Sequence, residues 1–218
     1  MKLPIFISFE GIDTTGKTTL VSALAQRLAA AGQSVGLKYE SPRDQDVSAR
    51  IEDSLKKSIF ISEGFEQGPQ AALLYMLYAE CLANQQVCTG ADLVLADRGI
   101  DSIAVYQGAA LQENDLVRAA SLLEVLEKLY SLIGGRIPDL TILLLISSED
   151  LQRRFNKRHD RMPTEAEFNE LINLQERFKH LASIRSRYVT FDAGTPNHEL
   201  QAAVMRNIEE IFDLRKTL

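Results

Sequence analysis

A short stretch near the amino terminus constrains this chain more than any other feature. Residues 11–18 read Gly-Ile-Asp-Thr-Thr-Gly-Lys-Thr and match the pattern G-x-x-x-x-G-K-[ST]. Residues 5–9 before it are β-branched and aromatic, which favours a buried strand, and apolar residues recur at helical spacing over 18–31. A strand, a glycine-containing loop and a helix in this order predict a loop whose backbone N–H groups face an anion at the helix N-terminus.

The residue types in this loop suit the phosphates of a nucleotide. Glycines allow successive backbone N–H groups to converge on phosphate oxygens, and Lys17 supplies a positive charge to the outer phosphates. The hydroxyl of Thr18 is a ligand for Mg²⁺. The sequence therefore predicts ATP and Mg²⁺ in a loop formed by Gly11, Ile12, Asp13, Thr14, Thr15, Gly16, Lys17, Thr18 and Thr19.

The remainder of the chain alternates between strand and helix patterns. The predicted strands span residues 5–9, 34–39, 93–96, 140–146 and 188–192, and the predicted helices span about 18–31, 69–87, 113–132, 148–157, 165–184 and 198–214. This alternation is typical of an α/β fold, with a doubly wound parallel five-stranded sheet flanked by helices. No repeat or linker interrupts it, so we expect one domain over residues 1–218.

The charge and composition of the chain limit the classes of molecule that it is expected to bind. A formal charge of −6 and a pI near 5.2 argue against a dedicated nucleic-acid binder. The apolar run at the amino terminus ends at Glu10, too soon for a signal peptide or membrane span, so a soluble cytoplasmic protein is expected. A basic cluster of Arg153, Arg154, Lys157, Arg158 and Arg161 is either a solvated helix face or a binding surface for a small anionic substrate.

The two further motifs of a GTP-dependent switch do not fit. In the pattern N-K-x-D, the aspartate of residues 156–160 falls one place too late, and in D-x-x-G the glycine that follows Asp97 falls one place too early. These mismatches disfavour a GTPase among the proteins that carry such a phosphate loop.

Four blocks in conserved order resemble the thymidylate kinases. Residues 9–19 are similar to the family signature F-E-G-x-D-x-x-G-K-[ST]-T, and residues 97–108 to its D-R-Y-x-x-S…Y-Q-G stretch. Residues 138–141 read P-D-L-T as in the family, and the basic cluster occupies the place of its lid, here about 153–165. The resemblance covers about residues 5–195 and implies a P-loop nucleoside monophosphate kinase fold, phosphoryl transfer from ATP to dTMP, and a homodimer.

On the donor side, the resemblance implies that Lys17 and the loop hold the ATP phosphates, and that Thr18 with Asp97 holds Mg²⁺. The loop contains no arginine, so the chain resembles the members whose catalytic arginine lies on the lid. Either Arg154 or Arg158 would then reach the transferring phosphoryl group.

On the acceptor side, the resemblance implies that Asp13 faces the 3′-hydroxyl of the sugar and that Arg98 bridges the donor and acceptor phosphates. Arg43 would grip the acceptor phosphate. Tyr106 and Gln107 belong to the Y-Q-G block and either contact the substrate or pack in an ordinary loop.

Two acidic residues within the family-like blocks have structural interpretations. Glu10 is interpreted as a residue that orients the phosphate loop, and Asp101 is interpreted as the N-cap of a helix that begins near Ser102.

The chain departs from the family where the family contacts the base. The arginine that contacts thymine is replaced by Ala79 or Leu82, depending on the alignment, and its polar neighbour by Ile103. Gly99 replaces the aromatic residue of D-R-Y. Two alternatives stay open: a kinase of this fold with another nucleotide or nucleoside acceptor, and a catalytically silent nucleotide-binding protein.

Overall fold

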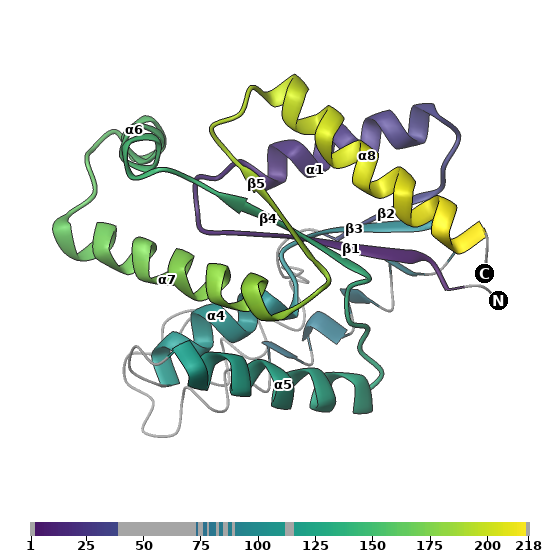
Figure 1. Ribbon diagram of the computed structural model, residues 1–218, viewed down its shortest axis with the longest axis horizontal. Helices are drawn as coiled ribbons and strands as arrows, with labels where there is room; N and C mark the ends of the chain where they lie inside the picture. The colour runs from purple at the N-terminus through teal and green to yellow at the C-terminus, as the bar shows by residue number, and fades with distance from the viewer. Residues whose placement is uncertain are drawn as a thin grey trace, which may run out of the picture.

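The apolar run at the amino terminus forms the central strand of a parallel sheet (Figure 1). The computed structural model describes residues 3–38, 73, 76–77, 79–81, 83–84, 87–88, 90–111 and 116–216. The strands are β1 (Ile5–Glu10), β2 (Val35–Lys38), β3 (Leu93–Asp97), β4 (Leu140–Leu145) and β5 (Tyr188–Asp192), in the order β2-β3-β1-β4-β5. All four pairings are parallel, which confirms the predicted sheet.

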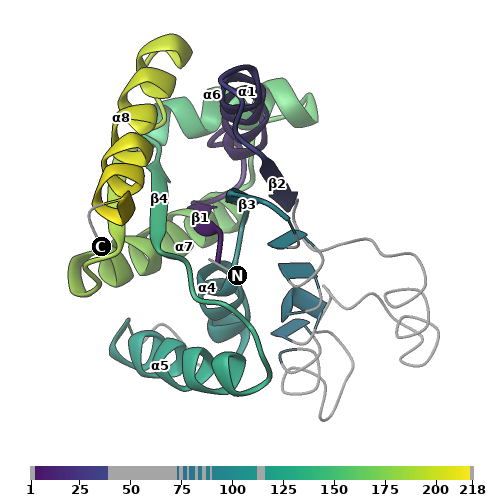
Figure 2. The same ribbon diagram turned by 90° about the vertical axis from the view of Figure 1, so that its right-hand side faces the viewer.

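Helices cover both faces of this sheet. They are α1 (Lys17–Ala30), α4 (Ile100–Leu111), α5 (Leu116–Leu132), α6 (Ser148–His159), α7 (Glu165–Ile184) and α8 (Asn197–Lys216). The described residues between 73 and 88 are also helical. Helices α1 and α8 pack on one face, and α4, α5 and α7 pack on the other (Figures 1 and 2).

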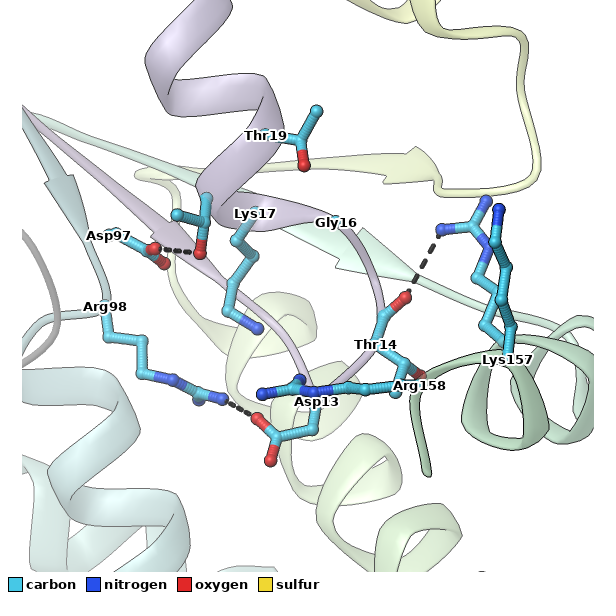
Figure 3. A pocket seen from close by; sticks show the side chains of 11 residues that line it. Asp13, Thr14, Gly16, Lys17, Thr19, Asp97, Arg98, Lys157 and Arg158 are labelled. Atoms are coloured by element: carbon cyan, nitrogen blue, oxygen red, sulfur yellow. Dashed lines mark hydrogen bonds and ion pairs between the residues drawn. The ribbon is translucent and has the colours of Figure 1, made fainter. Parts of the chain in front are cut away.

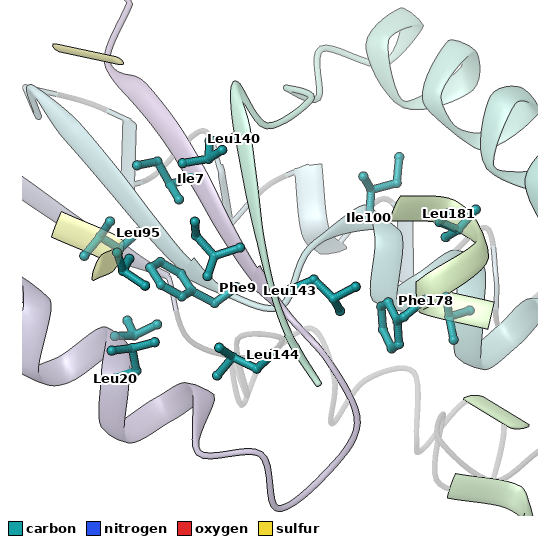
Figure 4. Packing of buried hydrophobic residues seen from close by; sticks show 14 of the residues in the cluster. Ile7, Phe9, Leu20, Leu95, Ile100, Leu140, Leu143, Leu144, Phe178 and Leu181 are labelled. Carbon is teal, nitrogen blue, oxygen red and sulfur yellow. The ribbon is translucent and has the colours of Figure 1, made fainter. Parts of the chain in front are cut away.

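The core lies on both faces of β1 and β4, as expected for strands covered by helices on each side. In β4, Leu144 lies toward Leu20 of α1, and its neighbour Leu143 lies toward Phe178 of α7 (Figure 4). Alternate residues of one strand thus pack against the two helical layers.

None of the helices that the structure describes is both long and apolar enough to span a bilayer.

Register places two motif segments at the same edge of the sheet. In the pairing of β1 with β3, Phe9 lies opposite Asp97, so the phosphate loop and the segment that begins at Asp97 leave neighbouring strands together. Helix α6 follows β4 at this edge (Figure 1).

The interpretation of Asp101 as a helix cap is wrong. Helix α4 begins at Ile100 instead of near Ser102, and Asp101 is fully buried in its first turn. Its carboxylate accepts hydrogen bonds from Arg187 at 2.5 Å and from the hydroxyl of Tyr188 at 2.6 Å. These partners on β5 and the residue before it hold the carboxylate between α4 and the sheet.

Glu10 ends β1 as a fully buried carboxyl group. The hydroxyl of Ser102 donates to its Oε2 at 2.5 Å. Burial, reinforced by the nearby charge of Asp101, raises the pKa of Glu10 to about 8, against the opposing effects of Ser102, Arg98 and Lys38. The group therefore carries a proton over a pH range in which an exposed glutamate is ionised.

This burial makes stability depend on pH in a defined direction. Between about pH 5 and 8 the folded protein holds a proton on Glu10 that the unfolded chain, whose pKa is near 4.5, has lost. The free energy of unfolding must therefore fall as the pH rises through this window. We predict that Glu10→Gln makes that fall shallower, measured by urea unfolding at pH 5 and pH 8.

The matched control is Glu170→Gln, a change at an exposed position of α7, which should leave the wild-type slope. The same slope in wild type and Glu10→Gln would contradict the assignment of a shifted pKa to Glu10.

Candidate active site

Backbone geometry explains the glycines of the phosphate loop. Gly11 has a φ of 137°, and a Cβ at this position would lie 2.5 Å from the carbonyl oxygen of Leu144. Gly16 has a φ of 91° and directly precedes α1. Only glycine adopts such φ values without strain, so the loop follows a path that ends at the helix N-terminus.

Lys17 lies inside this loop. Its ammonium group donates to the carbonyl oxygens of Gly11 at 3.0 Å and Ile12 at 2.8 Å. Burial, together with the positive charge of Arg98, lowers the pKa of Lys17 to about 8. A neighbouring anion would offset this cost, which is the environment that a phosphate-binding lysine requires.

Thr18 and Asp97 bring two oxygen ligands together. The Thr18 hydroxyl donates to Oδ2 of Asp97 at 2.5 Å (Figure 3). Hydroxyl and carboxylate oxygens are the ligands that Mg²⁺ prefers, and Mg²⁺ in phosphate sites commonly takes one or two protein groups with water and phosphate completing its shell. The donor set therefore fits the predicted metal.

A first cavity of about 480 Å³ opens beside the loop. Its walls combine loop and strand residues with three cations of α6; the lining residues are Asp13, Thr14, Gly16, Lys17, Thr18, Thr19, Asp97, Arg98, Arg154, Lys157 and Arg158. The loop residues Ile12 and Thr15 are buried and are not among the lining residues; the Thr15 hydroxyl donates to the Ile12 carbonyl at 3.0 Å.

The arginines of the basic cluster separate into distinct roles. Arg154 donates to the carbonyl oxygens of Thr15 at 3.1 Å and Ala193 at 2.5 Å, so it ties α6 to the loop. Arg158 extends from α6 across the cavity toward Asp13 (Figure 3). The remaining two point elsewhere: Arg153 pairs with Asp150, and Arg161 pairs with Glu167.

Arg98 connects the loop to a second cavity. Its guanidinium donates to the carbonyl oxygen of Gly11 and the hydroxyl of Ser102, each at 3.2 Å, and pairs with Asp13 (Figure 3). The guanidinium also lies over the ring of Tyr106, 4.9 Å from its centroid. Asp13 and Arg98 line both cavities.

The second cavity has a volume of about 260 Å³. Tyr106, Gln107 and Ile103 line it, as the motif positions predict for an acceptor pocket. Four further residues line it that the sequence did not predict, which are Lys38, Met76, Glu80 and Ser102. The cavity is thus less apolar than the replacement of the base-contacting arginine suggested.

Ala79 and Leu82 are the two positions that could replace the base-contacting arginine of the family. Met76 and Glu80 are one turn apart and face the cavity, whereas Ala79 is buried and does not line it. The i, i+4 spacing could have identified this pair, but no motif marked it. Leu82 and the predicted phosphate-binding Arg43 lie outside the described residues.

Comparisons with known proteins agree with this geometry. A family model described as thymidylate kinase matches residues 9–204. A thymidylate kinase of Mycobacterium tuberculosis is 32% identical over 173 residues, which cover 76% of this chain and 77% of the relative. Thymidylate kinases of Leifsonia xyli subsp. xyli and Deinococcus radiodurans are 29% and 28% identical, over 92% and 96% of this chain and 92% and 98% of the relatives. The chain therefore belongs to the thymidylate kinase family.

Proposed function

We propose that this protein transfers the γ-phosphoryl group of ATP to dTMP in the cytoplasm, with Mg²⁺, and so forms dTDP. The observation that carries the proposal is the junction of two cavities at Asp13 and Arg98. The phosphate loop lines one cavity. Tyr106 and Gln107 of the Y-Q-G block line the other. A donor and an acceptor bound in these cavities meet beside one positively charged guanidinium.

On the donor side, Lys17 and the loop N–H groups bind the outer phosphates. Thr18 and Asp97 would hold Mg²⁺, which neutralises phosphate charge when bound. Asp97 is buried at the end of β3, and this fixes the direction of its carboxylate.

Of the two arginines of α6 that were predicted to contact the transferring phosphoryl group, Arg158 is a better candidate than Arg154. Arg154 already donates to three backbone carbonyls, those of Thr14, Thr15 and Ala193. Arg158 has no hydrogen bond or ion pair within the part of the chain that the structure describes, and it extends into the cavity (Figure 3). In the transition state the charge of the transferring group is spread over its three equatorial oxygens, and a preorganised guanidinium beside them stabilises that state.

On the acceptor side, Arg98 binds the acceptor phosphate and Asp13 orients the sugar. The carboxyl side chain of Asp13 is 54% exposed and paired with Arg98, so it can accept a hydrogen bond from a sugar hydroxyl without leaving its position. Tyr106 and Gln107 enclose the nucleoside. Arg43 is proposed to bind the acceptor phosphate, as the family pattern implies.

We propose further that the protein is a homodimer. Family resemblance supports this, as do the exposed apolar side chains of Val125, Leu132 and Ile133 in and just after α5. Light scattering at micromolar protein concentration should give about twice the chain mass of 24.3 kDa. A mass of one chain would refute the proposal.

Arg158→Ala should lower kcat about a hundredfold or more, since it removes a charge aimed at the transition state. Its KM for ATP should change little. The matched control is Arg153→Ala, because Arg153 lies on the same helix but its side chain is 71% exposed and pairs with Asp150. Lys17→Ala serves as the positive control and should also lose about a hundredfold. Full activity in Arg158→Ala, with a large loss in Arg154→Ala, would reverse the two assignments.

The altered acceptor pocket should weaken discrimination between bases. dTMP and dUMP differ by one methyl group, which a pocket distinguishes by about 1–3 kcal/mol with or without the arginine. Loss of a donor to the base carbonyl should instead weaken the preference for dTMP over dCMP, whose base has an amino group in place of one carbonyl. Coupled ADP-release assays that give kcat/KM for dTMP, dUMP, dCMP and dGMP measure this directly. A preference for dTMP over dCMP beyond about a thousandfold would contradict the weak discrimination. Higher kcat/KM for dCMP or dGMP would assign the enzyme another acceptor.

A further inference from the structure

A buried ion pair lies against the backbone of Arg98. The ammonium group of Lys38, the last residue of β2, is 2.8 Å from Oε1 of Glu80. The same ammonium donates to the carbonyl oxygen of Arg98 at 2.7 Å. The two side chains are only 2% and 7% exposed. Burying such a pair rarely stabilises a fold more than apolar side chains of the same volume, so its cost calls for a role other than stability.

Arg98 has a backbone conformation that needs support. Its φ is 69°, in the left-handed region that is unfavourable for a residue other than glycine. Two hydrogen bonds hold this backbone: its N–H donates to the carbonyl oxygen of Phe9 at 3.0 Å, and its carbonyl accepts from Lys38. The left-handed turn comes directly after Asp97, so it sets the direction in which the guanidinium leaves β3.

We propose that Lys38 and Glu80 are positioning residues that hold Arg98 in its left-handed conformation, so that its guanidinium faces the junction of the two cavities. This inference rests on the proposed role of Arg98 in phosphoryl transfer. Lys38 acts through the Arg98 carbonyl, and Glu80 fixes the Lys38 ammonium and balances its charge.

The surroundings of the pair explain why both members are required. Without Lys38, the Arg98 carbonyl loses the hydrogen bond from this ammonium group, and Glu80 loses the ion pair that it makes with a described residue. Gly99 adds no side chain beside the pair; a Cβ there would lie 3.9 Å from Oε1 of Glu80 and 3.3 Å from Oε1 of Glu10.

The test separates positioning from stability with three variants. Lys38→Met leaves Glu80 without this ion pair, so its melting temperature and its kcat should both fall. The double variant Lys38→Met/Glu80→Met removes both charges, so its melting temperature should return close to that of wild type. Its kcat should stay about ten- to a hundredfold low, because Arg98 has lost its support. Glu80→Gln keeps an acceptor for Lys38 but removes the balancing charge, so its kcat should fall less than that of Lys38→Met.

The control for destabilisation alone is Val204→Ala, a fully buried position in α8. It should lower the melting temperature and leave the kcat of the folded protein unchanged. Wild-type kcat in the double variant would overturn the proposal. A raised KM for the acceptor with unchanged kcat would also overturn it, because it would show that the pair contacts substrate.

A crystal structure of the double variant gives a readout that does not depend on turnover. We expect Arg98 to leave positive φ and to lose its contact with Asp13. An unchanged Arg98 would refute the positioning role even if the wild type phosphorylated no acceptor, an outcome that would by itself refute only the proposed function.

Discussion

The parallel pairing of β1 with β3 fixes the position of the phosphate loop relative to Asp97 and Arg98. Phe9 lies opposite Asp97, and the Arg98 N–H continues the pairing by donating to the Phe9 carbonyl at 3.0 Å. The phosphate loop leaves one strand and the Asp97–Arg98 segment leaves the other, so they emerge side by side at the carboxyl edge of the sheet. Ligands in open α/β sheets bind at this edge for the same geometric reason.

Positive charge is concentrated at this edge of an acidic protein. The chain has a formal charge of −6, yet Lys17, Arg98, Arg154, Lys157 and Arg158 line one cavity. The charges come from separate elements: the start of α1, the end of β3 and helix α6. Helix α6 delivers three of them because positions 154, 157 and 158 share one helical face, while Arg153 and Arg161 pair with acidic neighbours.

Most of the fold and the position of the phosphate loop could be predicted from the sequence, because their signals are local. The strand pattern of residues 5–9, the loop motif and the following helix are contiguous, and the structure has all three where expected. The acceptor pocket could be predicted only in part. Lys38 and Glu80 are far apart in the sequence, and each would ordinarily be interpreted as a solvated charge. Asp101 was misinterpreted for a similar reason, since its partners Arg187 and Tyr188 come from the opposite end of the chain.

We propose that the two cavities are the donor and acceptor sites of one reaction. A bisubstrate compound that joins adenosine to thymidine through a polyphosphate chain tests it most directly, because such a compound must cross the Asp13–Arg98 junction. Steady-state inhibition should be competitive against both ATP and dTMP. Inhibition that is competitive against ATP alone, with no competition against dTMP, would show that the second cavity does not bind the acceptor.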